Sequence, residues 1–136
     1  MDIETSRILV VDDNDDIRDL IVHILKAHGY EVSEASNGET ALDLLTTQLP
    51  DLVLLDVMMP GLSGYEVVER IRSHENSQIA ATSILMITAK SQVTDVELAM
   101  ASGASGYLIK PFRQSTLIEK VHFILNQPQH AMERSL

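Results

Sequence analysis

The chain has 136 residues, a length that suits one globular domain with a substantial core, and 45% of them are hydrophobic. It contains no cysteine, which excludes a disulfide framework and a thiolate metal site, and its net charge of −10 argues against direct binding to nucleic acid or to an anionic membrane. The amino end is acidic where a secretory signal would be basic, and the most apolar window, residues 79–89, is too short to span a membrane. We therefore expect a cytoplasmic protein with basic or cationic partners, a divalent metal included.

The first third of the chain alternates between a strand pattern and a helix pattern. A β-branched apolar run over residues 7–11 predicts a buried strand and ends in the acidic segment 12–16. A stripe with helical spacing follows, closed by Gly29, and consists of Ile17, Leu20, Ile21, Ile24 and Leu25. Residues 30–35 alternate as an edge strand does, and Ser36-Asn37-Gly38-Glu39 predicts a capping box for a second helix.

A third apolar run, residues 52–55, is the centre of the pattern. It is followed by Pro60 and Gly61, which predicts a strand that is buried on both faces and stopped by a loop. Asp56 stands at the carboxyl end of this strand. In an open parallel sheet that edge is where ligands bind, so a carboxylate there is well placed for chemistry.

The rest of the chain repeats the alternation. The inward residues of a third helix are Val67, Val68 and Ile71, and residues 73–82 form a longer polar connection. We expect a strand at 83–88, a helix at 89–101 that ends at Gly103, and a strand at 106–110. A last amphipathic helix carries Leu117, Val121, Ile124 and Leu125. Residues 1–127 are predicted to form the domain, and residues 128–136 a partly disordered polar tail.

Five alternations of strand and helix predict an α/β fold, a parallel sheet with helices on both faces. Polar side chains then follow four of the strands and meet at one rim of the sheet. These residues are Asp12, Asp13, Asp56, Thr88 and Lys110.

The chemistry of this rim follows from its residue types. Three carboxylates placed together repel one another unless they protonate or bind a cation. Mg²⁺ takes about six oxygen ligands and is often held by carboxylates beside a phosphate. Lys110 and Thr88 suit phosphoryl oxygens, and the amides that open the helix after Thr88 could add anion donors. Because a carboxylate can act as a nucleophile, the residues predict a magnesium-dependent phosphoryl acceptor at Asp56.

Four motifs carry a family resemblance. They are Val-Val-Asp-Asp at 10–13, Leu-Leu-Asp-Val-Met-Met-Pro-Gly-Leu-Ser-Gly at 54–64, Ile-Thr-Ala at 87–89 and Gly-Tyr-Leu-Ile-Lys-Pro-Phe at 106–112. In this order they are highly specific, and the chain from Arg7 to Leu125 resembles the receiver domain of bacterial two-component response regulators, of the single-domain type of the chemotaxis regulators. The resemblance implies a flavodoxin-like, doubly wound, five-stranded parallel sheet of order 2-1-3-4-5 flanked by five helices.

The resemblance also implies roles for the rim residues. Asp56 would receive a phosphoryl group from a sensor histidine kinase, a phosphotransfer protein or a small phosphodonor. Asp13 and Asp56 would bind Mg²⁺ directly, Asp12 through water and Met58 through its backbone carbonyl, and Mn²⁺ or Ca²⁺ could substitute. Lys110 would pair with a phosphoryl oxygen. The domain would thus be regulatory rather than an enzyme, with self-catalysed phosphorylation and dephosphorylation of its aspartate.

A conformational switch is implied as well. Thr88 would swing toward the phosphoryl group, and Tyr107 would move from an outward to an inward rotamer, while the Lys110-Pro111 peptide bond would be cis. The readout surface is the family's fourth helix, fifth strand and fifth helix, which would contact an output protein or a fused output domain, or form a homodimer. Because no DNA-binding or catalytic segment follows Leu125, we expect a stand-alone regulator or a receiver taken from a longer protein.

Each rim residue also has a simpler structural explanation. Asp12 and Asp13 could cap a helix, as could Thr88; Lys110 could be a solvated charge, and Tyr107 a packing residue.

Other protein classes fit less well. An EF-hand is rejected because Ile17 stands where its glycine must be, and a haloacid-dehalogenase-type phosphatase because Met58 replaces its second aspartate. The main alternative function is a constitutive, phosphorylation-independent interaction or dimerisation module on the same fold.

Overall fold

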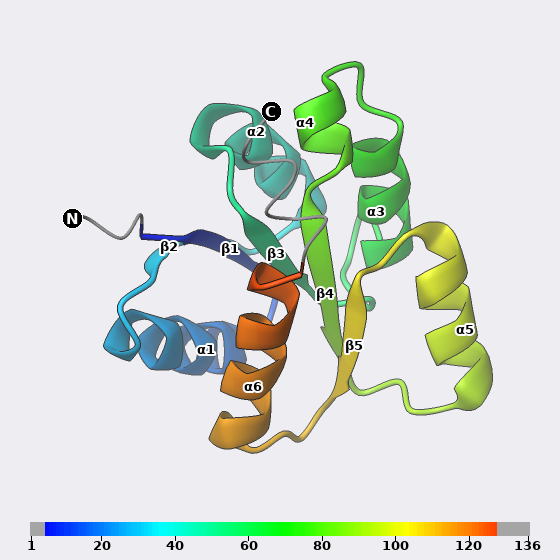
Figure 1. The fold of residues 1–136 in the computed structure, drawn as a ribbon. Helices are drawn as coiled ribbons and strands as arrows, with labels where there is room; N and C mark the ends of the chain where they lie inside the picture. Colours follow the sequence, from blue (N-terminus) through cyan, green and yellow to red (C-terminus); the bar gives the residue numbers. More distant parts are fainter. Residues whose placement is uncertain (1–4, 128–136) are drawn as a thin grey trace.

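A computed structural model of the protein describes residues 5–127, which form five strands and six helices (Figure 1). The strands are β1 (Arg7–Val11), β2 (Glu31–Ala35), β3 (Leu52–Leu55), β4 (Ser83–Thr88) and β5 (Gly106–Ile109). The helices are α1 (Asp15–Ala27), α2 (Gly38–Gln48), α3 (Gly64–Arg72), α4 (Ser77–Ala80), α5 (Val93–Ser102) and α6 (Gln114–Leu125).

The strands form one parallel sheet in the order β2-β1-β3-β4-β5, as predicted. In its register Val11 lies opposite both Ala35 and Leu55, and Thr88 lies opposite Ile109, so the carboxyl ends of the strands share one edge. The chain passes from β1 outward to β2 and then returns to pair β3 with β1. The strand order therefore reverses between β1 and β3, which is where ligands bind in open sheets of this kind.

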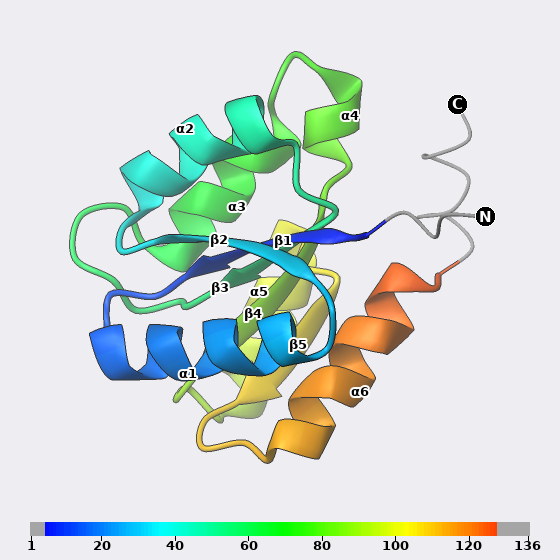
Figure 2. The same cartoon turned by 90° about the vertical axis from the view of Figure 1, so that its left-hand side faces the viewer.

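Helices cover both faces of the sheet (Figures 1 and 2): α1 and α6 lie on one face, and α2, α3 and α5 on the other. Successive strand residues feed the two cores alternately. Ile8 and Val10 pack under α1 and α6, whereas Leu9 and Val11 pack under the opposite helices. This two-sided burial explains why the central strands are apolar at nearly every position.

The sixth helix, α4, is a difference from the prediction of five. It occupies part of the segment 73–82 that was predicted to be a connection only. The Asn76 side chain accepts the amides of Gln78 and Ile79, and Ile79 is buried. A cap and one buried side chain stabilise a single turn here, but four residues are too few to give a helical periodicity in the sequence.

Three smaller predictions were also wrong. The α2 cap is Asn37, which accepts the Thr40 amide, rather than the expected Ser36–Glu39 capping box. Leu20 was expected on the buried stripe of α1 but is 53% exposed. The buried face of α1 includes Val22 instead, so Leu20 lies on the exposed side. The helix expected from residue 89 begins only at Val93, although it ends before Gly103 as predicted.

The tail at 128–136, which was predicted to be partly disordered, lies outside the described residues. Within residues 5–127, no helix combines the length and the apolar composition that crossing a membrane requires.

Candidate functional site

Two buried carboxylates lie at the reversal point of the sheet, each one residue beyond a strand. The Asp12 amide donates to the Ala35 carbonyl, and the Asp56 amide donates to the Val11 carbonyl. These bonds extend the strand ladders by one residue, which fixes both backbones. Asp12 is only 2% exposed, and Asp56 is buried as well. The strand pairing therefore brings two charged groups together inside the carboxyl edge of the sheet.

Asp13 completes a group of three carboxylates. Asp12, Asp13 and Asp56 each offer one oxygen, and these atoms all lie within 4.8 Å of one another. Asp13 is exposed while the other two are buried, so the group opens to solvent on one side. A cluster of oxygen ligands that is accessible from one side fits a hard cation such as Mg²⁺, which keeps several of its waters.

Lys110 reaches across the edge from the end of β5. Its Nζ lies 2.7 Å from Asp12 Oδ2 and 3.0 Å from Asp56 Oδ2, and the side chain is 14% exposed. Burial alone would lower the pKa of this ammonium, but the hydrogen bonds to Asp12 and Asp56 and the negative charge of both carboxylates together outweigh burial and raise the pKa above its usual value. The Lys110-Pro111 bond is cis, as predicted. The ammonium is therefore charged and stands directly beside both buried carboxylates.

The loop after β3 holds the Asp56 side chain. The Met58 amide donates to Asp56 Oδ1 at 3.1 Å, while the Met58 side chain is exposed. Gly64, at the start of α3, donates its amide to the Val57 carbonyl. A Cβ on Gly64 would overlap the Asp56 carbonyl oxygen, so only glycine allows this close approach.

Thr88 ends β4 on the same edge and is fully buried. Its hydroxyl oxygen accepts the Lys90 amide at 3.4 Å. The helix amides expected immediately after Thr88 are not there, because a capping box between Gln92 and Asp95 starts α5 at Val93. The amides of residues 89–92 belong to a loop instead.

Tyr107 links β5 to that loop. Its hydroxyl donates to the Lys90 carbonyl at 2.9 Å, and its ring packs against the core rather than pointing into solvent. Burial, together with Tyr65, Asp95 and Asp56, raises the pKa of Tyr107 to about 12. The phenol is therefore neutral and available as a donor at every physiological pH.

Sequence reasoning missed two residues near the site. Arg18, on α1, donates to the Asp12 carbonyl. In the sequence, its place just after the acidic segment 12–16 is the only sign that it lies near the site. Tyr65 packs against the same core as Tyr107, and its buried hydroxyl has no hydrogen-bond partner among residues 5–127. Both depend on contacts between distant elements, which local patterns do not encode.

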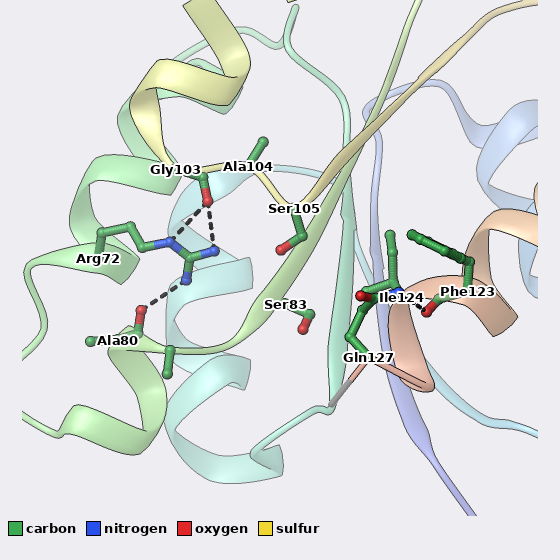
Figure 3. A pocket seen from close by; sticks show the side chains of 10 residues that line it. Arg72, Ala80, Ser83, Gly103, Ala104, Ser105, Phe123, Ile124 and Gln127 are labelled. Atoms are coloured by element: carbon green, nitrogen blue, oxygen red, sulfur yellow. Dashed lines mark hydrogen bonds between the residues drawn. The ribbon is translucent and has the colours of Figure 1, made fainter. Parts of the chain in front are cut away.

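A cavity of about 440 Å³ lies beside Asp56, between the loop after β3 and the loop after β4. Its lining includes Met58, Ser63, Tyr65 and Lys90. A larger cavity, of about 510 Å³, lies at the opposite edge of the sheet, next to the first residues of β4 and β5 (Figure 3).

The larger cavity contains Arg72, the last residue of α3. Its guanidinium donates to the carbonyls of Ala80 and Gly103 at 2.7 to 3.0 Å (Figure 3). It also donates to the Thr82 carbonyl at 2.6 Å. This arginine fastens α4 and the turn before β5 to α3. The contacts of Arg72 to these carbonyls are structural. The three carboxylates and Lys110 lie at the carboxyl edge of the sheet, which is therefore the candidate site.

Comparisons with known proteins agree with this geometry. The sequence model of the response regulator receiver domain matches residues 8–122. The chain is 36% identical over 121 residues to the DNA-binding response regulator MtrA of Mycolicibacterium smegmatis, covering 89% of this chain and 51% of the relative. It is 40% identical over 130 residues to the alkaline phosphatase synthesis transcriptional regulatory protein PhoP of Bacillus subtilis, covering 96% and 52%. The chain thus spans about half the length of the curated relatives it matches.

Solved structures show the same fold. The chemotaxis response regulator CheY4 of Vibrio cholerae superposes with a TM-score of 0.83 at 35% identity, over 90% of this chain and 100% of that one. The BeF3-activated N-terminal receiver domain of RstA from Klebsiella pneumoniae gives 0.80 at 27% identity, with the same coverage. The resemblance drawn from the four motifs is confirmed, and the chain belongs to the response regulator receiver domain family of two-component systems.

Proposed function

We propose that this chain is a phosphorylation-activated signalling switch in which Asp56 accepts a phosphoryl group with the help of Mg²⁺. The observation that carries the proposal is the meeting of three carboxylates and the Lys110 ammonium at the carboxyl edge of the sheet. A structural ion pair needs only one carboxylate for each ammonium. Two buried carboxylates and an exposed third leave an excess of negative charge that suits a divalent cation.

The donor set fits the proposed metal. Asp13 and Asp56 would bind Mg²⁺ directly, Asp12 through a water molecule, and Met58 through its backbone carbonyl. All of these ligands are oxygens, which Mg²⁺ prefers, and Mn²⁺ or Ca²⁺ could substitute for the same reason. When bound, the cation would offset the negative charge that gathers on the carboxylates and on the phosphoryl oxygens.

The transfer step uses the Asp56 carboxylate as the nucleophile. One of its oxygens forms the new P–O bond, while the P–N bond to the histidine of the donor breaks and its electron pair leaves with the imidazole. The ammonium of Lys110 lies 3.0 Å from Asp56 Oδ2 and can pair with a phosphoryl oxygen next to that carboxylate. The donor is a sensor histidine kinase or phosphotransfer protein, or a small phosphodonor.

The switch proper involves Thr88 and Tyr107. The Thr88 hydroxyl would turn toward the phosphoryl group. The rotamers of Tyr107 would then shift in population from outward to inward, where the ring fills the space that Thr88 leaves. Both side chains contact Lys90, Thr88 through its amide and Tyr107 through its carbonyl, which supports a coupling between them.

The output surface comprises α5, β5 and α6, because α4 is the additional turn and the family's fourth helix corresponds to α5. It exposes Val93, Leu98 and Ile109. We propose that a downstream protein, a fused output domain or a second copy of the chain binds there. The names of two relatives describe DNA-binding or transcriptional regulators, so the absence of direct nucleic-acid binding stays a prediction for this chain.

Mass spectrometry of the intact protein tests the proposal. Incubation with acetyl phosphate should add one phosphoryl group in the presence of Mg²⁺ and none when the metal is chelated. Asp56→Asn should abolish the gain, whereas Asp51→Asn, a control at the other end of the same strand, should retain it. No gain in the wild-type protein would contradict the proposal and favour the constitutive interaction module.

A further inference from the structure

One side chain outside the proposed metal ligands holds the backbone that carries them. Arg18, on α1, is 14% exposed and donates from all three of its guanidinium nitrogens. Nε lies 2.9 Å from Glu34 Oε1, Nη2 lies 2.7 Å from Asp15 Oδ1, and Nη1 lies 2.9 Å from the Asp12 carbonyl oxygen. The guanidinium thus ties β2 and α1 to the segment that connects β1 with α1.

The bond to the Asp12 carbonyl matters because of the peptide unit to which that carbonyl belongs. A peptide unit is planar, so the direction of the Asp12 carbonyl also fixes the amide and the Cα position of Asp13. The Asp12 amide is held by Ala35, and its carboxylate is held by the Asn14 amide and by Lys110. Arg18 holds the one remaining group, the carbonyl.

Asp13 depends on this backbone more than its neighbours do. Its carboxylate is exposed, whereas those of Asp12 and Asp56 are buried and bonded to Lys110. An exposed side chain has little packing to fix its direction. The carboxylate of Asp13 therefore reaches the other two oxygens chiefly because its Cα is correctly placed.

The two acids that hold Arg18 keep its planar fork in one orientation. Glu34 belongs to β2 and Asp15 to the first turn of α1, so the guanidinium is anchored from two elements before it meets the Asp12 carbonyl. A lysine ammonium also has three donors, but all of them sit on one nitrogen. The arginine fork spreads its donors over three nitrogens, and each of these meets a different acceptor here, which is why arginine suits this position.

From this geometry we propose that Arg18 is a positioning residue for the cation site, which sets the Asp12–Asp13 peptide so that the Asp13 carboxylate faces Asp56. This inference rests on the proposed function, since it concerns the same metal.

Two effects of removing Arg18 have opposite signs. As a cation near the site, Arg18 repels Mg²⁺, so loss of its charge alone would tighten Mg²⁺ binding. Loss of positioning would weaken binding, because Asp13 must then be ordered when the metal arrives. The direction of the change therefore separates a positioning role from a charge effect.

Isothermal titration with Mg²⁺ measures that direction. Arg18→Met should raise the dissociation constant for Mg²⁺ roughly fivefold to tenfold, the net effect of about one ordinary hydrogen bond. Arg7→Met is the matched control, because Arg7 also joins β1 to a glutamate of β2 and to a backbone carbonyl, but at the other end of the strands. It should leave the dissociation constant unchanged within about twofold.

A second variant keeps the test decisive if Arg18→Met does not fold. Arg18→Lys retains the charge, and with it the repulsion of Mg²⁺, but lacks the arginine fork, so it should bind Mg²⁺ more weakly than the wild type and at least as weakly as Arg18→Met. With acetyl phosphate, both variants should need more Mg²⁺ for half-maximal phosphorylation and should approach the wild-type rate at saturating Mg²⁺. A loss of folding alone would lower the rate at all Mg²⁺ concentrations.

The outcomes distinguish this inference from the proposed function. If a folded Arg18 variant binds Mg²⁺ as tightly as the wild type, or more tightly, the positioning role is wrong and the magnesium site stands. If the wild-type protein binds no Mg²⁺, both the magnesium site and the role of Arg18 are wrong.

Discussion

Replacement of Lys110 by methionine removes the only ammonium bonded to the buried carboxylates among residues 5–127 while keeping most of the side-chain volume. The Nζ lies 2.7 Å from Asp12 and 3.0 Å from Asp56, and at an effective dielectric constant of about 20 each contact contributes roughly 5 to 6 kcal/mol of gross attraction. Desolvation of the three charges offsets most of this attraction. Because removing one member of a buried ion pair costs about 3 to 5 kcal/mol and Lys110 is 14% exposed, we expect a loss near 3 kcal/mol.

The loss should depend on magnesium. With the metal chelated, Lys110→Met leaves Asp12 and Asp56 as neighbouring anions with no cation. With Mg²⁺ at about 100 times its dissociation constant, a form that binds the ion gains about 2.7 kcal/mol of stability. The variant should bind Mg²⁺ more tightly than the wild type, because the ammonium no longer occupies the two carboxylates, so the ion should restore much of its stability.

Urea unfolding followed by circular dichroism, with chelator and with saturating Mg²⁺, measures both effects. Lys26→Met is the control, because Lys26 is an exposed lysine on α1, and it should change the free energy of unfolding by less than about 0.5 kcal/mol. A Lys110→Met variant that is as stable as the wild type in chelator, or that Mg²⁺ stabilises less than it stabilises the wild type, would contradict the proposed balance of charges.

Two further predictions concern other parts of the molecule. Arg72→Met should lower the free energy of unfolding by roughly 2 to 4 kcal/mol, because three carbonyls lose charge-assisted bonds, while Mg²⁺ affinity stays unchanged. Arg70→Met, an exposed change on the same helix, is its control, and equal unfolding curves for the two variants would contradict the prediction. Tyr107 holds its proton more tightly in the folded protein than in the unfolded chain, so its contribution to stability is complete below pH 10 and falls as the pH approaches about 12. In an ultraviolet titration of phenolate formation, the transition at the highest pH should be missing from Tyr107→Phe. Complete ionisation of all tyrosines of the wild-type protein near pH 10 would contradict the raised pKa of Tyr107.

The sheet and the meeting of its polar residues could be predicted because both follow from local patterns plus one rule of topology. Continuous apolar runs identify strands that are buried on both faces, and parallel strands bring their carboxyl ends to one edge. Asp12, Asp56 and Lys110 each directly follow such a run. Their proximity therefore needs no knowledge of side-chain contacts.

Helix boundaries were harder, because competing local bonds decide them. The segment after Thr88 has enough apolar residues for a helix from residue 89, but the Lys90 amide bonds to Thr88 and the capping box begins at Gln92. The turn α4 depends on one asparagine cap and one buried isoleucine. Neither feature has a period that a sequence pattern could reveal.

The contacts of Arg18 and the buried hydroxyl of Tyr65 lay beyond prediction for a different reason. Arg18 meets Glu34 of β2 and the Asp12 carbonyl only once β1, β2 and α1 have packed. Tyr65 reads as an ordinary aromatic residue of α3, and only tertiary packing buries its hydroxyl. Such groups are determined by three-dimensional neighbours rather than by spacing along the chain.

The most direct test of the central claim is to locate the phosphoryl group. After reaction with acetyl phosphate and Mg²⁺, borohydride reduces an aspartyl phosphate to homoserine, and tandem mass spectrometry of the tryptic peptide of residues 27–70 separates Asp56 from Asp43 and Asp51. Homoserine should appear at position 56 alone, and only when Mg²⁺ is present. Homoserine at another position, or an acid-stable phosphate on a serine or threonine, would contradict it.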